Sequence, residues 1–181
     1  MTNRTRLLLL AGLALAALAQ ARDKPYDPAA EGYVVIGIAP GDYVVEISVG
    51  DADDKLWTGT KSRPAFAGRP KDGYIVARVP ANTDLAITRI RPPGKRRSGW
   101  TWCRTTFTPL LKVAPGHVAY FADITYHWPE DFEPWFTTAI DFDRARAHVE
   151  ANYPQLRGLI EQGEWRTVRP QTGCGANGSV S

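Results

Sequence analysis

The sequence predicts a mainly β protein, an antiparallel β-sandwich with a helical segment near its C-terminus. Three observations support this prediction. Short apolar runs rich in β-branched and aromatic residues recur between positions 32 and 140, turn-forming residues separate these runs, and helical spacing begins only near Asp141. Of the 181 residues, those after a leader would make one domain. We expect a β-sandwich domain over residues 32–169, helices at about 141–162, and a flexible tail over 170–181.

Residues 1–21 have the pattern of a cleaved signal peptide. Two arginines precede an apolar run of about a dozen residues at 7–18, which is shorter than a membrane span of about 20 residues. Small residues place the expected cleavage after Ala21, with Ala19 as the second choice. A polar linker over 22–31 follows, and no later segment is apolar enough to span a membrane. We therefore expect a periplasmic or secreted protein.

Charge and cysteine content narrow the function classes. The formal net charge is +3, and removing the two positive charges of Arg4 and Arg6 leaves +1. A nearly neutral mature chain argues against nucleic-acid binding, which requires a strong positive balance. Two cysteines, Cys103 and Cys174, are expected to form one disulfide in an oxidising compartment. No motif for a cofactor or a catalytic nucleophile is present, so we expect no cofactor.

The first half of the domain is expected to form four strands. Residues 33–39 are rich in β-branched side chains, and apolar and polar residues alternate over 43–49, with a Pro-Gly-Asp turn between the two runs. Residues 74–79 and 85–91 form the next pair, separated by a Pro-Ala-Asn-Thr turn. The segment between these pairs is mostly loop, with Trp57 in a short strand.

Three further strands are expected over 100–107, 117–127 and 134–140. The run 117–127 is the longest. If it is regular, its odd-numbered residues, among them Phe121 and Asp123, share one face opposite the buried even-numbered residues. Seven strands with turns between them are typical of a β-sandwich, and a small, partly open barrel is the main alternative.

The chain after these strands is expected to be helical. Asp141 and Asp143 suit the N-terminus of a helix whose body is 144–152. Pro154 suits the first turn of a second helix that continues through Glu161. We expect the two helices to pack on an edge or an open end of the sandwich.

Four short segments resemble a broad group of uncharacterised Gram-negative envelope proteins with an immunoglobulin- or transthyretin-like β-sandwich. They are a Gly-aromatic-Val-Val strand at 32–36, a strand with a proline corner at 73–85, a Val-x-Pro-Gly pattern within 111–124, and Asn-Tyr-Pro-x-Leu at 152–156. The resemblance implies the fold and an envelope location. It implies no catalytic residue and no ligand.

A basic segment is the first candidate binding surface. It contains Arg89, Arg91, Lys95, Arg96 and Arg97 around a Pro-Pro-Gly sequence, which is expected to project from the sheet. Such a cluster suits an anionic partner: an envelope protein, an anionic glycan or a lipid headgroup. The alternative is a solvated hairpin tip that carries charge only for solubility.

Tryptophans are the second candidate. Trp100 and Trp102 share a face if their strand is regular, and the chain has six tryptophans in total. Exposed indoles stack on sugar rings, so a carbohydrate-binding module is the alternative function. If these side chains instead fill the core, the tryptophan content is structural.

Acidic residues over 130–143 are the third candidate. Paired carboxylates beside aromatic residues occur in glycosidases, and oxygen ligands suit calcium. The alternative is a solvated loop in which Asp141 and Asp143 cap a helix. We expect no metal site, since no three or four ligands converge in the pattern. The sequence therefore favours a non-enzymatic binding or structural module of the cell envelope, with a glycosidase or metal-dependent hydrolase as a further alternative.

Export generates a direct prediction. N-terminal sequencing of the protein purified from periplasm or medium should begin at Arg22, or at Gln20 if the second site is used, because signal peptidase requires small residues before the cut. Recovery of the exported protein with Met1 intact would contradict the assignment.

Overall fold

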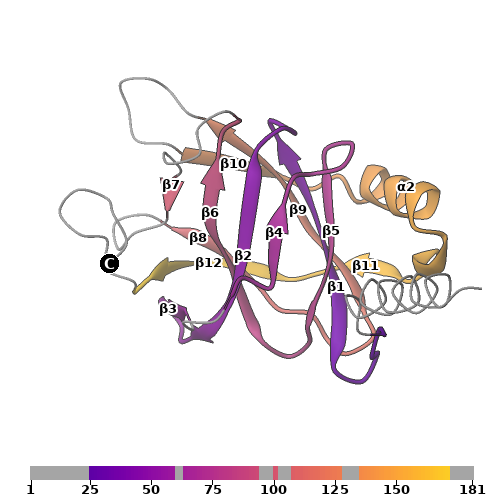
Figure 1. Ribbon diagram of the computed structural model, residues 1–181, viewed down its shortest axis with the longest axis horizontal. Coiled ribbons are helices and arrows are strands. Elements are labelled where there is room, and N and C mark those ends of the chain that lie inside the picture. Colours follow the sequence, from indigo (N-terminus) through magenta and orange to yellow (C-terminus); the bar gives the residue numbers. More distant parts are fainter. Residues whose placement is uncertain (1–24, 60–62, 94–99, 102–106, 128–134, 172–181) are drawn as a thin grey trace, which may run out of the picture.

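The computed structural model describes residues 25–59, 63–93, 100–101, 107–127 and 135–171, with backbone alone at 100–101 (Figure 1). Several sequence predictions therefore fall outside the described residues. They are the signal peptide, the disulfide between Cys103 and Cys174, the basic residues Lys95, Arg96 and Arg97, the side chain of Trp100, Trp102, the acidic residues of 130–133, and the tail from 172.

The protein is mainly β, and its strands form two sheets. The first sheet has the order β10-β9-β1-β5, and β11 also pairs with β9. Its strands are β1 (Glu31–Ala39), β5 (Tyr74–Pro80), β9 (Val118–His127), β10 (Trp135–Ala139) and β11 (Ile160–Gln162). β10 and β11 pair with the same edge of β9. β11 pairs with residues 118–120 at the beginning of β9, and β10 pairs with residues 123–127 at its end.

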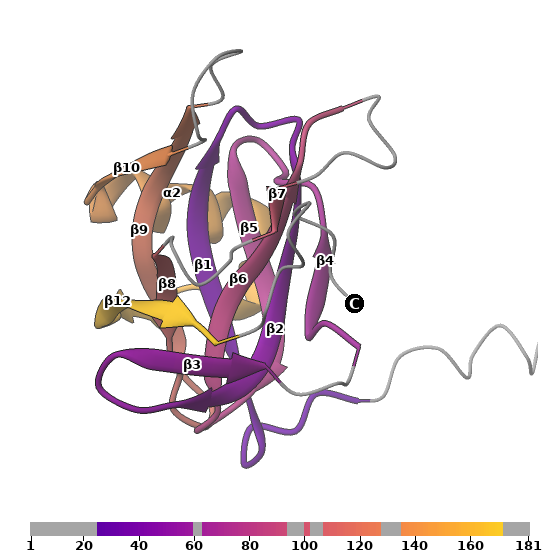
Figure 2. The same ribbon diagram turned by 90° about the vertical axis from the view of Figure 1, so that its left-hand side faces the viewer.

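The second sheet closes on itself in part. Its strands are β2 (Val44–Ala52), β3 (Leu56–Gly59), β4 (Phe66–Gly68), β6 (Asp84–Arg91), β7 (Trp100–Thr101), β8 (Thr108–Leu111) and β12 (Trp165–Pro170). β2 pairs with β6, β6 with β8, β8 with β12, β12 with β3, and β3 again with β2. These strands surround a small barrel (Figure 2).

The expectation of a purely antiparallel sandwich is wrong, because both sheets are mixed. β1 and β11 run parallel to β9, and β12 runs parallel to β3. Parallel pairs need long crossovers. Here β2 to β8 intervene between β1 and β9, and α2 (Phe142–Asn152) intervenes between β10 and β11. The strand directions therefore follow from connections that no local pattern specifies.

The main core lies between the two sheets. Val34, Ile36 and Ile38 of β1 meet Val45 and Ile47 of β2 in one buried cluster. The alternation predicted over 43–49 is confirmed, because these alternate residues are buried in the core and the intervening polar residues are not. Burial of such alternating faces is the main stabilising term of a two-sheet structure.

Trp57 fills the small barrel. Its side chain is 2 % exposed and packs with Ala86, Leu110 and Val168. Gly50 lies directly beside it, so that a Cβ at Gly50 would come within 2.5 Å of the indole nitrogen. The barrel can hold a tryptophan only because its wall lacks a side chain at this point.

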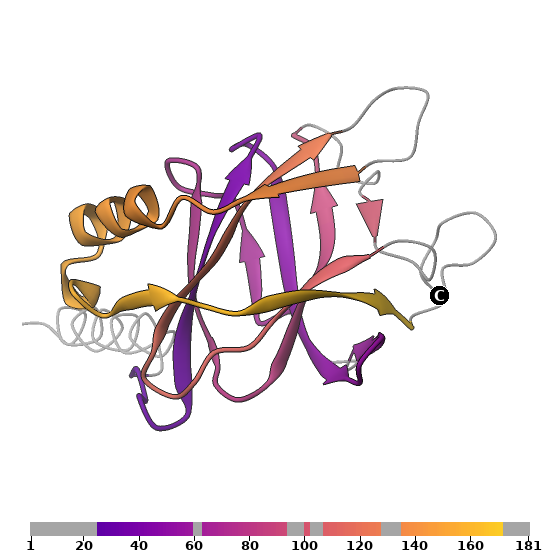
Figure 3. The same ribbon diagram turned by 180° about the vertical axis from the view of Figure 1, so that it is seen from behind.

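The helix α2 covers part of the outer face of the first sheet. Asp141 caps α2 by accepting a hydrogen bond from the backbone N–H of Arg144 at 3.2 Å, as the sequence predicted. Ala145 and Val149 pack on Val35 and Tyr120 of the sheet. Figures 1 and 3 show the helix at the opposite end of the long axis from β3.

The expected second helix does not form. Pro154–Leu156 makes one 3₁₀ turn, and Gly158 then has a φ of 73°, which ends helical geometry. Ile160 enters β11, and β12 follows, although the sequence analysis placed the last strand at 134–140. These two strands are short, and each is specified by pairing with distant strands rather than by its own pattern.

The barrel generates a stability prediction. Gly50→Ala should lower the free energy of unfolding by about 1–3 kcal/mol, because its methyl group overlaps the Trp57 indole and both are enclosed. Gly41→Ala is the matched control, since a Cβ there meets no atom closer than 3.8 Å and should change stability by less than about 0.5 kcal/mol. Chemical denaturation measures both. Equal midpoints for the two variants would contradict the packing argument.

Candidate binding surface

A β-bulge in β9 decides which of its side chains face outward. Val35 of β1 pairs with Tyr120 of β9, and Gly37 of β1 pairs with Asp123 of β9. Between these two pairs β1 advances by two residues but β9 advances by three. The extra residue leaves both Phe121 and Ala122 in the main core. The expectation that Phe121 and Asp123 share a face is therefore wrong, because one inserted residue reverses the alternation beyond it.

Beyond the bulge, the outer face of the first sheet carries a set of small, polar and aromatic side chains. We call this set the outer patch. It comprises Gly37 and Ala39 of β1, Asp123, Thr125 and His127 of β9, and Trp135, Thr137 and Ala139 of β10, which the strand register places on one face. The β10 members and Ala39 are exposed, and the β9 members are half-buried. α2 packs over Val35, Val118 and Tyr120, on the other half of the same face.

Trp135 forms the aromatic end of the outer patch. Its ring stacks on His127 with centroids 3.8 Å apart and planes 18° apart, and 49 % of Trp135 stays exposed. The His127 ring also lies within hydrogen-bond distance of the Thr137 hydroxyl, 3.3 Å from Nε2 to Oγ1. The indole is therefore held in one orientation while much of its surface remains open to solvent.

Arg144 forms the charged end of the outer patch. From the first turn of α2 its Nη2 donates to the Asp123 carboxylate, and its Nε donates to the Tyr74 hydroxyl at 2.9 Å. Asp141 lies 3.4 Å from the same Nε. Hydrogen bonds to Asp123 and Tyr74 raise the pKa of Arg144, so the guanidinium stays charged. This network ties the helix to both β9 and β5.

Two tyrosines complete the network as neutral groups. The backbone N–H of Asp141 donates to the Tyr120 hydroxyl at 3.0 Å. Burial, followed by the charge of Asp123, raises the pKa of Tyr120 to about 12. Burial also raises the pKa of Tyr74. Both hydroxyls are therefore protonated near neutral pH and serve as hydrogen-bonding groups rather than as bases.

Gly37 makes room for the carboxylate of Asp123. A Cβ at Gly37 would overlap the Oδ1 atom of Asp123. The half-buried carboxylate can therefore lie across β1 only where β1 has no side chain.

A cavity of about 470 Å³ lies where the outer patch meets α2. It shares Gly37, Ala39, Asp123 and Thr125 with the patch, and Tyr74, Arg144 and His148 also line it. His148 stacks on Tyr74 with centroids 4.6 Å apart. Burial lowers the pKa of His148, and its Nδ1 lies 3.3 Å from the Asn152 amide nitrogen, so the ring is neutral near pH 7. The lining thus has one charged donor, Arg144, two carboxylates, of Asp72 and Asp123, and several neutral polar groups.

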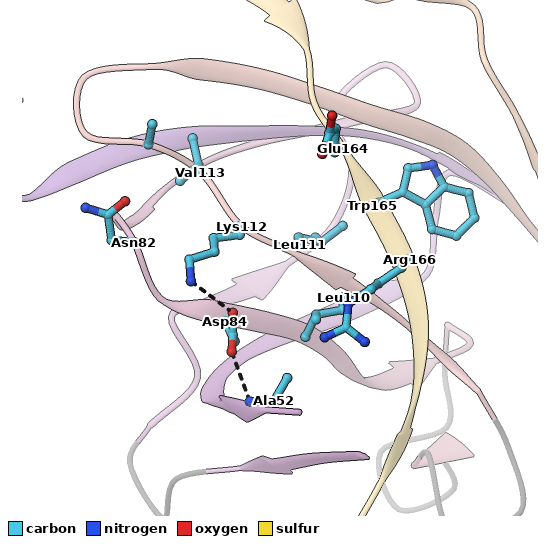
Figure 4. Close-up of a pocket in the computed structure, with 11 residues that line it drawn as sticks. Ala52, Asn82, Asp84, Leu110, Leu111, Lys112, Val113, Glu164, Trp165 and Arg166 are labelled. Atoms are coloured by element: carbon cyan, nitrogen blue, oxygen red, sulfur yellow. Dashed lines mark hydrogen bonds and ion pairs between the residues drawn. The ribbon is translucent and has the colours of Figure 1, made fainter. Parts of the chain in front are cut away.

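A second hollow of about 680 Å³ lies beside β8 and β12 (Figure 4). There Asp84 accepts from the backbone N–H of Ala52 at 2.9 Å and lies 3.5 Å from Lys112. Arg166 donates to the main-chain oxygens of Asp53 and Asp54. Figure 4 shows the Trp165 indole on the other side of β12 from Asp84 and Lys112. These charges fasten β12 and β8 to the barrel, and Trp165, which also lines the hollow, is half-buried against the main core.

The basic residues predicted to bind a partner are placed in part. Arg89 and Arg91 lie in β6 and pair with Glu46 of β2 at 4.0 and 3.5 Å. Arg89 and Glu46 are direct cross-strand partners. Glu46 therefore compensates part of the positive charge of this segment, and the binding role of the remaining basic residues stays a prediction.

The tryptophans divide between core and surface. Trp57 is buried and Trp165 half-buried, whereas Trp135 is exposed. Trp100 is placed by its backbone opposite Ile90. In the sequence, Trp135 was counted only among the six tryptophans. It was missed as a site residue because nothing local showed that its strand would pair with His127.

The acidic candidates have structural partners where they are described. Asp141 caps α2, and Asp143 pairs with Arg146 at 2.6 Å. Within the described ranges, no three His, Cys, Asp or Glu side chains are grouped to hold a metal ion. The same part of the chain holds no helix long and apolar enough to cross a membrane.

Comparison with known proteins adds no assignment. No protein-family model, no curated protein and no solved structure matches this chain. The resemblance to envelope proteins stays a prediction.

The tyrosine network generates a pH prediction. The folded-state pKa of Tyr120 lies above its ordinary value of 10.0, so its contribution to stability is complete below pH 10 and is lost as the pH rises toward about 12. Tyr120→Phe should therefore lose less stability than the wild type between pH 9 and about 12, even though its stability at pH 8 is lower. Urea denaturation of both proteins at pH 9 and at a pH of about 12 measures the loss of stability. An equal loss in the two proteins would contradict the role assigned to Tyr120.

Proposed function

We propose that this chain is an exported, non-enzymatic binding module of the cell envelope that binds a glycan on the outer patch. The observation that carries the proposal is the exposed Trp135 indole, stacked on His127 and aligned with polar side chains along one strand face. The alternative function of the sequence analysis, a carbohydrate-binding module, depends on exposed tryptophan, and Trp135 supplies it.

The chemistry of the outer patch suits sugars. An indole face packs on the apolar side of a sugar ring. Sugar hydroxyls both donate and accept, and the patch offers the hydroxyls of Thr125 and Thr137 and the paired charges of Asp123 and Arg144. Asp123 and His127 lie about 13 Å apart along β9 at roughly 3.3 Å per residue, which is long enough for more than one sugar ring.

The state of the polar groups favours binding over catalysis. A glycosidase needs two carboxyl groups about 5–9.5 Å apart that can act as acid and base or nucleophile. Asp123 is instead held by Arg144, and Asp141 is occupied as a helix cap. A glycosidase or metal-dependent hydrolase would need the acidic residues of 130–133, which lie outside the described residues.

The wider assignment is also part of this proposal. The tripartite start of the sequence supports export to the periplasm or beyond. Two sheets that face each other across one core support an immunoglobulin- or transthyretin-like relationship. An anionic glycan, a lipid headgroup or an envelope protein at the basic segment 89–97 is proposed as a second partner.

Glycan binding generates a test by mutation. Trp135→Ala should weaken binding of neutral oligosaccharides about tenfold or more, because the substitution removes the stacking surface. Trp135 is exposed and does not belong to the buried core. Isothermal titration with a panel of neutral oligosaccharides measures the affinity. The matched control is Phe107→Ala, which removes an aromatic side chain of similar exposure, 47 %, outside the patch. Equal affinities for wild type and Trp135→Ala, or no binding by the wild type, would refute the proposal.

A further inference from the structure

We propose that the cavity between α2 and the first sheet binds a protonated amino group of the ligand, so that the preferred glycan carries free amines. This inference rests on the proposed function, because the cavity shares four residues with the outer patch.

Asp72 is held at the rim by a tight turn. The backbone N–H of Lys71 donates to the Tyr74 oxygen at 2.8 Å, and the N–H of Tyr74 donates back to Lys71 at 2.9 Å. Asp72 and Gly73 between them have φ values of 50° and 84°, the signature of a type I′ turn, for which Asp-Gly is a preferred sequence. The turn therefore fixes the backbone from which the Asp72 side chain projects at the cavity.

The Asp72 carboxylate has no counter-ion among the described residues. It is exposed, lines the cavity, and takes part in no hydrogen bond or ion pair within the part of the chain that the structure describes. By contrast, Asp123 and Asp141 both pair with Arg144. Asp72 thus differs from the other carboxylates around the cavity in being available to a ligand.

The groups around the cavity carry an excess of negative charge. Two carboxylates, of Asp72 and Asp123, line the cavity beside one cation, the guanidinium of Arg144, which is already paired with Asp123. His148 adds no charge near neutral pH, because burial lowers its pKa. One negative charge is left over, so the cavity attracts a cation and disfavours an acidic sugar.

The size of the cavity limits the cation to a small group on a larger chain. A volume of about 470 Å³ is at the lower end of ligand pockets, which span roughly 300–1,000 Å³. A primary ammonium has three N–H donors, which suit the Asp72 carboxylate and the Thr125 hydroxyl, both of which belong to the lining. An amino sugar with a free amine combines this group with the ring and hydroxyls that the outer patch accommodates.

The test compares two oligosaccharides of equal length that differ only in acetylation. A glucosamine oligomer with free amines and its fully N-acetylated counterpart are titrated against the mature protein at pH 6 and low salt. The free-amine oligomer should bind about tenfold more tightly, the factor of one charge-assisted hydrogen bond, and the difference should shrink as salt rises.

Variants assign the preference to the cavity. Asp72→Asn should abolish the difference between the two oligomers, because asparagine tolerates the positive φ of the turn but carries no charge. Asp51→Asn, an exposed carboxylate on β2, is the matched control and should keep the preference. Trp135→Ala should weaken both oligomers by the same factor.

The outcomes separate the two proposals. Equal affinity for the two oligomers, or a preference that survives in Asp72→Asn, overturns the cavity assignment while leaving glycan binding in place. No measurable binding of either oligomer or of the neutral panel overturns both.

Discussion

Strand β9 and its bulge are the constraint on which the rest of the structure depends. β9 pairs with β1 along one edge and with both β10 and β11 along the other. Its first residues face α2, and the bulge places both Phe121 and Ala122 in the main core. Because side chains alternate strictly along a strand, one extra residue turns Asp123 to the outer face. The same irregularity that fills the core therefore creates the outer patch.

The position of α2 depends on polar contacts as much as on packing. Only Ala145 and Val149 of the helix are buried, so the apolar surface that it contributes is small. Arg144 supplies the further attachment by binding Asp123 of β9 and Tyr74 of β5. The wall of the cavity is consequently fixed to two strands of the sheet. A fixed wall reduces the ordering cost of binding, which suits a recognition site.

Much of the fold could be predicted from the sequence where the signal was local. The strands near 33–39, 43–49 and 134–140 were predicted by β-branched content and alternation, and they formed close to the expected bounds. The helix from Phe142 was predicted by its Asp141 cap. β11 and β12 were not predicted, because their pairing with β9 and β8, which lie far away in the sequence, specifies them. The closed barrel was likewise not specified by any local pattern, since it depends on pairing between β3 and β12.

The candidate site shows the same division. The sequence by itself determined the mainly β class, the alternating core faces, the helix cap and the export signal pattern, because each depends on neighbours within a few residues. The tertiary structure alone decided that Trp135 stacks on His127, that Arg144 reaches Asp123, and that Asp72 lies at the rim of the cavity that Arg144 and Asp123 line. These residues come from β9, β10, α2 and the turn before β5. Their meeting depends on one bulge and on long-range strand pairing, and neither leaves a local pattern in the sequence.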